Sequence, residues 1–211
     1  MRSIFSRSGI IVLVILGAML SGCITTNPSQ PAKFYLLSPM SESKKAPQVE
    51  AGEGRFAIGV GPVQIPEYLN RPQIVSRKST IELFLDEFNK WAEPLEDNFT
   101  RVLAENLANI LHTDPIAIFP SRGSIPVDYR VTVDVIRFDG MMGKDITLIA
   151  RWAIFGKERE ELLSIRRSVY TESAGENNYQ TFIQAQSRAV EKLSKDIAAA
   201  IKELISGKAK S

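Results

Sequence analysis

The stretch YRVTVDVIRF, residues 129–138, decides the fold of this 211-residue chain. Polar and apolar residues alternate along it, which is the period of a strand with one buried face, here formed by Tyr129, Val131, Val133 and Val135. Residues 146–155 and 161–171 continue as strands, and GMMG at 140–143 is typical of a tight connection. These segments predict an antiparallel meander with one buried and one polar face.

Two segments with the 3.6-residue period of an amphipathic helix accompany this meander. The first starts at WAEPL, residues 91–95, with Pro94 near the first turn, and its apolar positions are Leu95, Phe99, Val102, Leu103, Leu107, Ile110 and Leu111. The second starts near Asn178, a favourable N-cap, and repeats apolar residues every seven positions at Ile183, Val190, Ile197 and Leu204. We expect this helix of about 27 residues to pack on the sheet, with a coiled coil between subunits as the alternative.

Shorter strands are predicted at residues 33–37, 55–63, 73–76, 80–85 and 116–119. In the fourth of these, Ile81, Leu83 and Leu85 would share one face. Gly59 and Gly61 imitate a phosphate loop, but Pro62 lacks an N–H, so we favour a strand bulge or a close approach of backbones. The order of elements predicts an α/β domain with a mixed, mostly antiparallel β-sheet and two long amphipathic helices.

The first 22 residues have the parts of a secretory signal. Arg2 and Arg7 make its start basic, and the apolar run at 10–20 is too short for a helix to cross about 30 Å of hydrocarbon. Leu20-Ser21-Gly22-Cys23 then resembles the lipobox of bacterial lipoproteins, in which the cysteine is acylated and begins the mature chain. We expect lipidation at Cys23, the only cysteine in the sequence. An ordinary signal peptide or a signal anchor is the alternative.

This interpretation divides the chain into four parts. Residues 1–22 would be the lipoprotein signal peptide, 23–32 the acylated Cys and a flexible tether, 33–207 a single periplasmic α/β domain, and 208–211 a C-terminal tail. Two or more acyl chains hold a protein stably on a membrane. Ile24 follows the cysteine, and the lack of an aspartate there resembles an outer-membrane address. We therefore expect a lipid-anchored, periplasm-facing protein of the outer membrane.

The net charge of the expected mature chain argues against some classes of function. Of the 26 basic residues, Arg2 and Arg7 lie in the first 22 positions, so 24 remain against 24 acidic residues. This neutrality argues against nucleic-acid binding, which needs a basic stripe, and against polybasic attraction to anionic lipid. The remaining residues, about 190, are enough for the core of one domain.

The residues form no recognisable catalytic or metal-binding constellation. The single histidine, His112, falls at the end of the first helix, where a cap or surface position is favoured over catalysis. No second histidine or free cysteine completes a metal site or a nucleophile–base pair. We expect no enzyme activity, no cofactor and no metal; a hydrolase with an unrecognised site is the weakest alternative.

The segment PVQIPEYLNRPQIV, residues 62–75, is the candidate interaction site. Its three prolines limit backbone freedom, and Tyr68 and Leu69 are apolar in an otherwise polar turn. One interpretation is an exposed, preformed surface that binds a partner through Tyr68, Leu69 and Arg71. The other is a packed loop whose Tyr68 and Leu69 fill the edge of the core. We interpret Trp91 as a structural residue before the first helix.

Several segments together resemble one family. They are the lipobox, FYLL at 34–37, IGVGPV at 58–63, PEYLNRPQIV at 66–75 and WAEPL at 91–95. Over nearly the whole expected mature domain the chain is similar to ABC-type transport auxiliary lipoproteins of the PqiC/YmbA type. This resemblance implies a fold like the anticodon-binding-like and TolB N-terminal-like α/β domains.

The same resemblance implies a non-enzymatic accessory lipoprotein of a mammalian-cell-entry (MCE) system, which moves lipids between the inner and outer membranes and supports membrane integrity. The expected partners are an MCE-domain protein and the inner-membrane ABC transporter, with self-association left open. The alternative is a periplasmic lipoprotein that itself binds a lipid or another apolar ligand. A closed apolar cavity of several hundred Å³ would favour that alternative.

Overall fold

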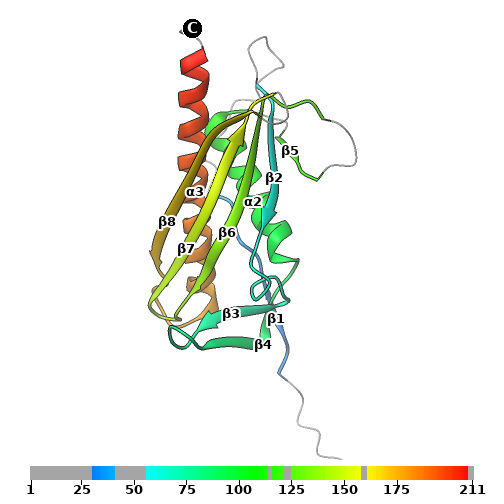
Figure 1. The fold of residues 1–211 in the computed structure, drawn as a ribbon. Coiled ribbons are helices and arrows are strands. Elements are labelled where there is room, and N and C mark those ends of the chain that lie inside the picture. Colours follow the sequence, from blue (N-terminus) through cyan, green and yellow to red (C-terminus); the bar gives the residue numbers. More distant parts are fainter. Residues whose placement is uncertain (1–29, 41–55, 114–115, 121–124, 158–160, 209–211) are drawn as a thin grey trace, which may run out of the picture. The chain divides into compact units, whose positions relative to one another are not determined.

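The computed structural model describes residues 30–40, 56–113, 116–120, 125–157 and 161–208, and Ala32–Ser211 form one compact unit. The elements are β1 (Lys33–Tyr35), β2 (Ile58–Gln64), β3 (Gln73–Arg77), β4 (Leu83–Trp91), α2 (Leu95–Leu111), β5 (Ile116–Ile118), β6 (Tyr129–Gly140), β7 (Asp145–Phe155), β8 (Leu162–Ser173) and α3 (Tyr179–Lys208). The strands form a five-stranded and a three-stranded sheet. The small sheet lies at the end of the unit opposite the C-terminal end of α3 (Figure 1).

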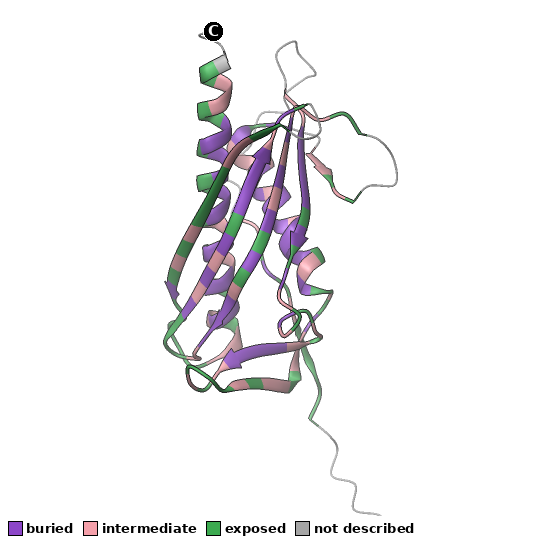
Figure 2. Ribbon diagram, viewed as in Figure 1, coloured by how far each residue is buried: buried purple, intermediate pink, exposed green. Residues whose placement is uncertain are grey.

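The five-stranded sheet has the order β5-β2-β6-β7-β8. β2 runs parallel to β5 and β6, whereas β6, β7 and β8 form the predicted antiparallel meander. Buried residues alternate along β6 and β7 (Figure 2), and the four positions predicted for the buried face are each at most 5% exposed. The α/β class with a mixed sheet and two long helices is therefore confirmed.

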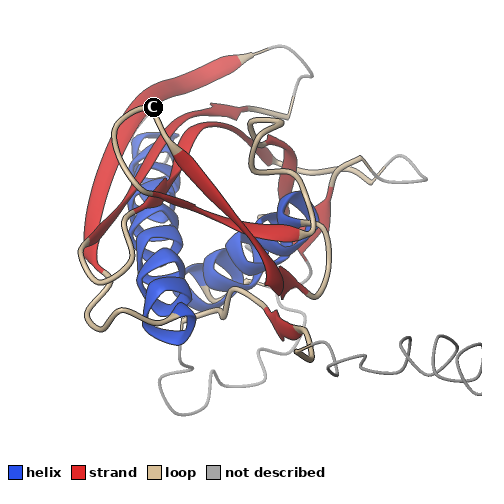
Figure 3. Cartoon of the chain, turned by 90° about the horizontal axis from the view of Figure 1, so that it is seen from below, coloured by secondary structure: helices blue, strands red, loops and turns tan. Residues whose placement is uncertain are grey.

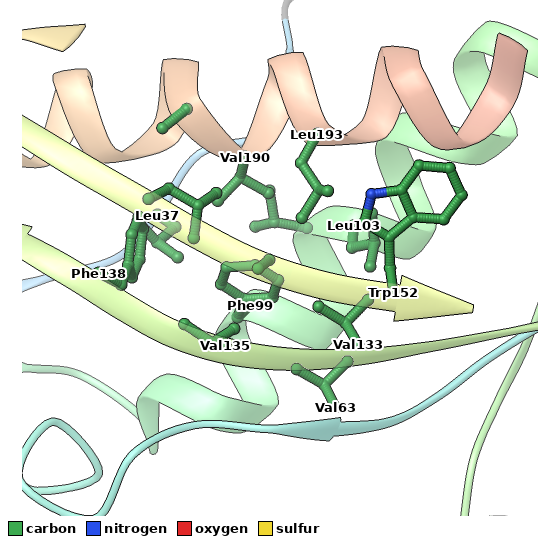
Figure 4. Packing of buried hydrophobic residues seen from close by; sticks show 14 of the residues in the cluster. Leu37, Val63, Phe99, Leu103, Val133, Val135, Phe138, Trp152, Val190 and Leu193 are labelled. Atoms are coloured by element: carbon green, nitrogen blue, oxygen red, sulfur yellow. The ribbon is translucent and has the colours of Figure 1, made fainter. Parts of the chain in front are cut away.

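Both helices cover one face of the large sheet (Figure 3). The apolar positions of α3 enter the core between the sheet and α2, and Val190 and Ile197 are fully buried there. Phe99 of α2 meets Phe138 of β6 edge to face, with ring centroids 5.5 Å apart (Figure 4). The seven-residue repeat of α3 thus packs within this chain, as the first of the two interpretations predicts.

The helix ends follow their local sequence. Asn178 caps α3, because its Oδ1 accepts a hydrogen bond of 2.9 Å from the N–H of Thr181. α2 ends at Leu111, and His112 takes the left-handed conformation with φ of 51°. α2 begins later than predicted, at Leu95, since Pro94 holds the N-cap position and Trp91 is the last residue of β4.

The strands divide into two sheets where one sheet was predicted, and β4 differs from the strand expected at 80–85. Lys78 and Ser79 donate backbone N–H groups to the carbonyl of Glu82, which closes a hairpin before β4 begins at Leu83. Ile81 lies in this hairpin and is 93% exposed, so it does not share a buried face with Leu83 and Leu85. The small sheet has the order β1-β4-β3.

The paired glycines of β2 serve backbone packing. The register between β2 and β6 shifts between Val60 and Val63, as a bulge requires. Gly61 has φ of +117°, and a Cβ there would lie 2.1 Å from the carbonyl oxygen of Phe119. The interpretation as a bulge with a close backbone approach is confirmed.

The segment after β1 is held between the two helices by polar side chains. Asn98 and Asn106 of α2 accept hydrogen bonds from the backbone N–H groups of Leu37 and Met40, at 2.7 and 2.8 Å. Ser187 of α3 accepts one from Ser38 at 3.1 Å. These bonds fix β1, and with it one edge of the small sheet, to the helical layer.

Candidate partner-binding surface

The loop between β2 and β3 begins as a tight turn. The N–H groups of Leu69 and Asn70 both donate to the carbonyl oxygen of Pro66, at 2.8 and 3.2 Å. At its end, the carbonyl oxygen of Pro72 accepts the N–H of Trp91 at 2.8 Å. The loop is thereby fastened to the small sheet, and its two prolines, Pro66 and Pro72, add to this rigidity.

The structure places the three predicted contact residues differently from one another. Leu69 is 2% exposed and belongs to the hydrophobic core, as the interpretation of a packed loop predicts and that of an exposed surface does not. The ring of Tyr68 packs against the edge of that core, and its hydroxyl donates to Asp139 Oδ2 at 2.7 Å. Arg71 is half-buried. A role of these residues in partner binding stays a prediction, and for Leu69 it cannot be a direct contact in this conformation.

Tyr68 belongs to a buried charged cluster that joins the loop to both sheets. Asp139, near the end of β6, has a fully buried side chain that accepts hydrogen bonds from Arg77 of β3 at 2.5 and 2.9 Å and from Arg137 at 2.8 Å. Burial raises the pKa of Asp139, but the hydrogen bonds from Arg77, Tyr68 and Arg137 outweigh it and lower the pKa below its ordinary value. Burial and the bond to Asp139 raise the pKa of Tyr68 to about 12.

Two of the segments that carry the family resemblance meet in one open pocket of about 460 Å³. It is lined by Asn70, Arg71, Pro72, Trp91, Ala92, Glu93 and Pro94. The loop supplies one side, and the link from β4 to α2 supplies the other. Trp91, interpreted from sequence as a structural residue, is 5% exposed and also contributes to the pocket lining.

The two charged side chains of this pocket, Glu93 and Arg71, differ in whether an ion pair already neutralises them. Glu93 is paired with Arg101 of α2 at 2.6 Å. Arg71 forms no ion pair with the described residues, and its buried Nε has no hydrogen-bond partner among them. A guanidinium presents several N–H donors in a rigid fork that fits a carboxylate or a phosphate. The pocket can therefore bind an anionic or carbonyl-rich group of a partner.

Two further pockets, of about 400 and 410 Å³, lie beside the segment after β1 and beside α2. All three open to solvent, so none of them is the closed apolar cavity that would favour ligand binding inside the protein. Within the described ranges, no three His, Cys, Asp or Glu side chains lie close enough to bind a metal ion. None of the described helices combines the length and apolar character of a membrane span. Cys23 lies outside the described residues.

Comparisons with known proteins agree with this geometry. The chain is 27% identical over 143 residues to the intermembrane transport lipoprotein PqiC of Escherichia coli K12 and equally to that of Shigella flexneri, covering 67% of this chain and 72% of each relative. A crystal structure of an uncharacterized protein matches with a TM-score of 0.65 and 18% identity, covering 82% of this chain and 99% of that one. A protein from Xanthomonas campestris matches with a TM-score of 0.64 and 17% identity, covering 85% and 98%. These structures share the fold.

The family comparison covers most of the described unit. The model of the ABC-type transport auxiliary lipoprotein component matches residues 35–198, which extend from β1 into α3. Both sides of the pocket at Arg71 and Trp91 fall within this match. The chain belongs to the ABC-type transport auxiliary lipoprotein family.

Proposed function

We propose that this protein is a non-enzymatic accessory lipoprotein of an intermembrane lipid transport system. Acylated Cys23 would hold it on the periplasmic face of the outer membrane, where it docks an MCE-domain protein and so links the inner-membrane transporter to that membrane. Family membership supports a transport auxiliary role, and its bacterial relatives carry the name intermembrane transport lipoprotein. The proposed acylation rests on Cys23, and the proposed docking rests on the pocket at Arg71 and Trp91.

One observation carries the docking role. The loop segment at 66–75 and the link at 91–95 are far apart in sequence, but the hydrogen bond from Trp91 to Pro72 brings them together as the lining of one pocket. The loop is rigid before any partner binds, so little conformational entropy is lost on docking. Arg71 supplies an uncompensated cation beside a large aromatic side chain, and such residues are enriched at the energetic centres of interfaces.

Cys23→Ser tests the anchor. The thiol is the atom that acylation modifies, so this variant should be recovered without acyl chains and outside the outer-membrane fraction. Mass spectrometry of the N-terminal peptide and membrane fractionation measure both results. An outer-membrane protein that is still processed after Gly22 in the Cys23→Ser variant would contradict the lipoprotein assignment.

Arg71→Ala tests the docking surface, with Arg167→Ala as its control. Arg167 is an exposed arginine of β8, so both variants remove one positive charge, but only the first alters the pocket. Full-length protein extracted in mild detergent should capture the MCE-domain protein, and Arg71→Ala should lose this capture. If both variants capture the MCE-domain protein equally well, the pocket is not the docking surface. Absence of any MCE-domain partner from the wild-type protein would refute the proposed function.

A further inference from the structure

The small sheet exposes a set of large apolar side chains that the core does not use. We call this set the apolar rim, and its members are Phe34, Leu36, Ile81, Phe84 and Phe88, with exposed fractions of 63, 43, 93, 38 and 42%. They lie on β1, directly after it, in the β3–β4 hairpin and on β4. Figure 2 shows the contrast within the sheet, because β3 is largely buried whereas β4 is mostly intermediate or exposed. Single exposed apolar residues are ordinary, but a group of this size on one small sheet indicates a contact surface.

The covalent connection to Cys23 decides what this surface meets. Lys33, the first residue of β1, follows Cys23 by ten positions, and a fully extended chain covers at most about 36 Å over that length. The N-terminal end of β1 therefore stays within that distance of a lipid surface that holds the acyl chains. This step rests on the lipid anchor of the proposed function.

The length of α3 limits the orientation. α3 has 30 residues and so extends about 45 Å. Its first residue lies at the small sheet, since the Tyr179 hydroxyl donates to Asp86 of β4 at 2.9 Å and its ring centroid is 6.1 Å from that of Tyr35. An orientation with the C-terminal end of α3 on the lipid would leave β1 about 45 Å away, beyond the reach of the tether. The small sheet is the end of the unit that the anchor holds near the lipid.

The chemistry of the rim suits the boundary between lipid headgroups and acyl chains. Ile81 stands in a hairpin that can enter this layer without exposing a long edge of backbone. The Lys78 Nζ lies 5.1 Å from the ring centroid of Phe84. Long cationic side chains and aromatic rings are typical of the headgroup layer, where an apolar part meets lipid and a polar part meets water. Apolar area inserted at this depth strengthens membrane binding without spanning the bilayer.

We propose that the apolar rim is a membrane-contact surface, which inserts Ile81 and the phenylalanine side chains of the rim into the lipid leaflet that holds the anchor. The acyl chains then fix the protein to the membrane, and the rim fixes its orientation. With the small sheet on the lipid, α3 and the large sheet extend away from the membrane. The anchor alone, on a tether of this length, would leave the unit free to tilt and rotate.

Depth-dependent fluorescence quenching tests this proposal. Acylation blocks the thiol of Cys23, the only cysteine in the sequence. In the full-length Ile81→Cys variant the new cysteine is therefore the one free thiol, and it can be labelled selectively with an environment-sensitive dye. The matched control is Val169→Cys on β8, which is also exposed, at 52%, but lies outside the small sheet. Both proteins are reconstituted into vesicles of phosphatidylethanolamine and phosphatidylglycerol that contain nitroxide-labelled lipids.

We expect a blue-shifted emission and strong nitroxide quenching at Ile81, and neither effect at Val169. Equal quenching at the two positions, or quenching at neither, would overturn the proposal. Protection of the Ile81 dye from a water-soluble quencher without quenching by the lipids would also overturn it, because another protein segment or copy would then cover the rim. A failed anchor gives a different result, since the N-terminal peptide would carry no acyl chains and the protein would not float with vesicles. That result would refute the proposed function together with this proposal.

Discussion

Asp139→Asn should strongly destabilise the protein, because it removes the only negative charge from a cluster of two arginines and a tyrosine hydroxyl. The Asp139 side chain is fully buried, whereas those of Arg77 and Arg137 are 18 and 37% exposed. Breaking a buried ion pair on one side costs about 3–5 kcal/mol, and water can reach both arginines, so we expect the lower value of about 3 kcal/mol. For a unit of this size that cost corresponds to a melting temperature lower by about 6–12 °C.

The matched control is Asp134→Asn, which removes the same charge from the exposed face of β6. Asp134 is 51% exposed, and its oxygen lies 3.7 Å from Arg151, so its loss should cost less than about 0.5 kcal/mol. Thermal and urea unfolding of the full-length protein in detergent, followed by circular dichroism, compares the two variants. Equal melting temperatures would show that the Asp139 cluster adds nothing to stability and would refute this reasoning.

The stability lost in Asp139→Asn should depend on pH, and the pKa of Asp139 fixes the direction of that dependence. Hydrogen bonds lower the pKa of Asp139 in the folded protein despite its burial, so its contribution is present above the unfolded pKa of about 3.9 and is lost as the pH falls through the folded value. The stability difference between wild type and Asp139→Asn should therefore be constant near neutral pH and shrink below about pH 4. A difference that persists unchanged in acid would contradict this assignment.

Three further variants, with Ile81→Ala as a control for the first of them, test the loop and the helical layer. Leu69→Ala should lower stability by about 3 kcal/mol because it leaves a cavity in the core, whereas Ile81→Ala, at an exposed position, should leave the melting temperature unchanged. Asn98→Ala should cost about 2 kcal/mol, measured by urea unfolding, since the N–H of Leu37 loses its acceptor. Tyr68→Phe removes a group whose raised pKa, about 12, gives stability below pH 10 that is lost as the pH rises towards 12, so the variant should be less sensitive to alkali than wild type. An unchanged alkaline melting curve would count against the bond from Tyr68 to Asp139.

The meander and the helices could be predicted because each depends on a repeating local pattern. Val131, Val133 and Val135 alternate at the strand period, and all three are at most 2% exposed. α3 shows the helix period along its whole length, and Asn178 supplies a cap signal next to it. A pattern of this kind requires no knowledge of which segment packs opposite.

The polar residues of the core could not be predicted, because their partners are distant in sequence. Asn98 lies on the buried face of α2, and the N–H that it satisfies belongs to Leu37, 61 residues earlier. Asp139 is separated from Arg77 by 62 residues and from Tyr68 by 71, and its nearby partner Arg137 does not by itself distinguish a buried carboxylate from the many solvated ones. Burial of a charge becomes favourable only once the tertiary structure brings its donors together.

The loop at 62–75 shows the same limit for the candidate site. Its prolines correctly predict a rigid turn, but no periodicity exists in a loop to separate a core residue from an exposed one, and Leu69 proved to be core. Arg71 was selected from sequence, but its pocket forms only in the folded protein, where residues 70–72 and 91–94 meet and the N–H of Trp91 bonds to Pro72. The tertiary structure determines which residues surround a loop residue, and the local sequence of the loop does not encode that information.

The placement of the Asp139 cluster connects the two proposed surfaces. Arg77 brings β3 of the small sheet to the cluster, Tyr68 brings the loop that lines the pocket, and Asp139 itself belongs to the large sheet. If the rim rests on lipid and the pocket binds a partner, this carboxylate is an attachment to the large sheet that both surfaces share, in addition to the bonds that hold β1 to the helices. Asp139→Asn should then weaken partner capture and lipid quenching at Ile81 together at temperatures below unfolding, whereas Arg71→Ala should weaken capture alone. Loss of both signals in Arg71→Ala would show that the surfaces are not separable in this way.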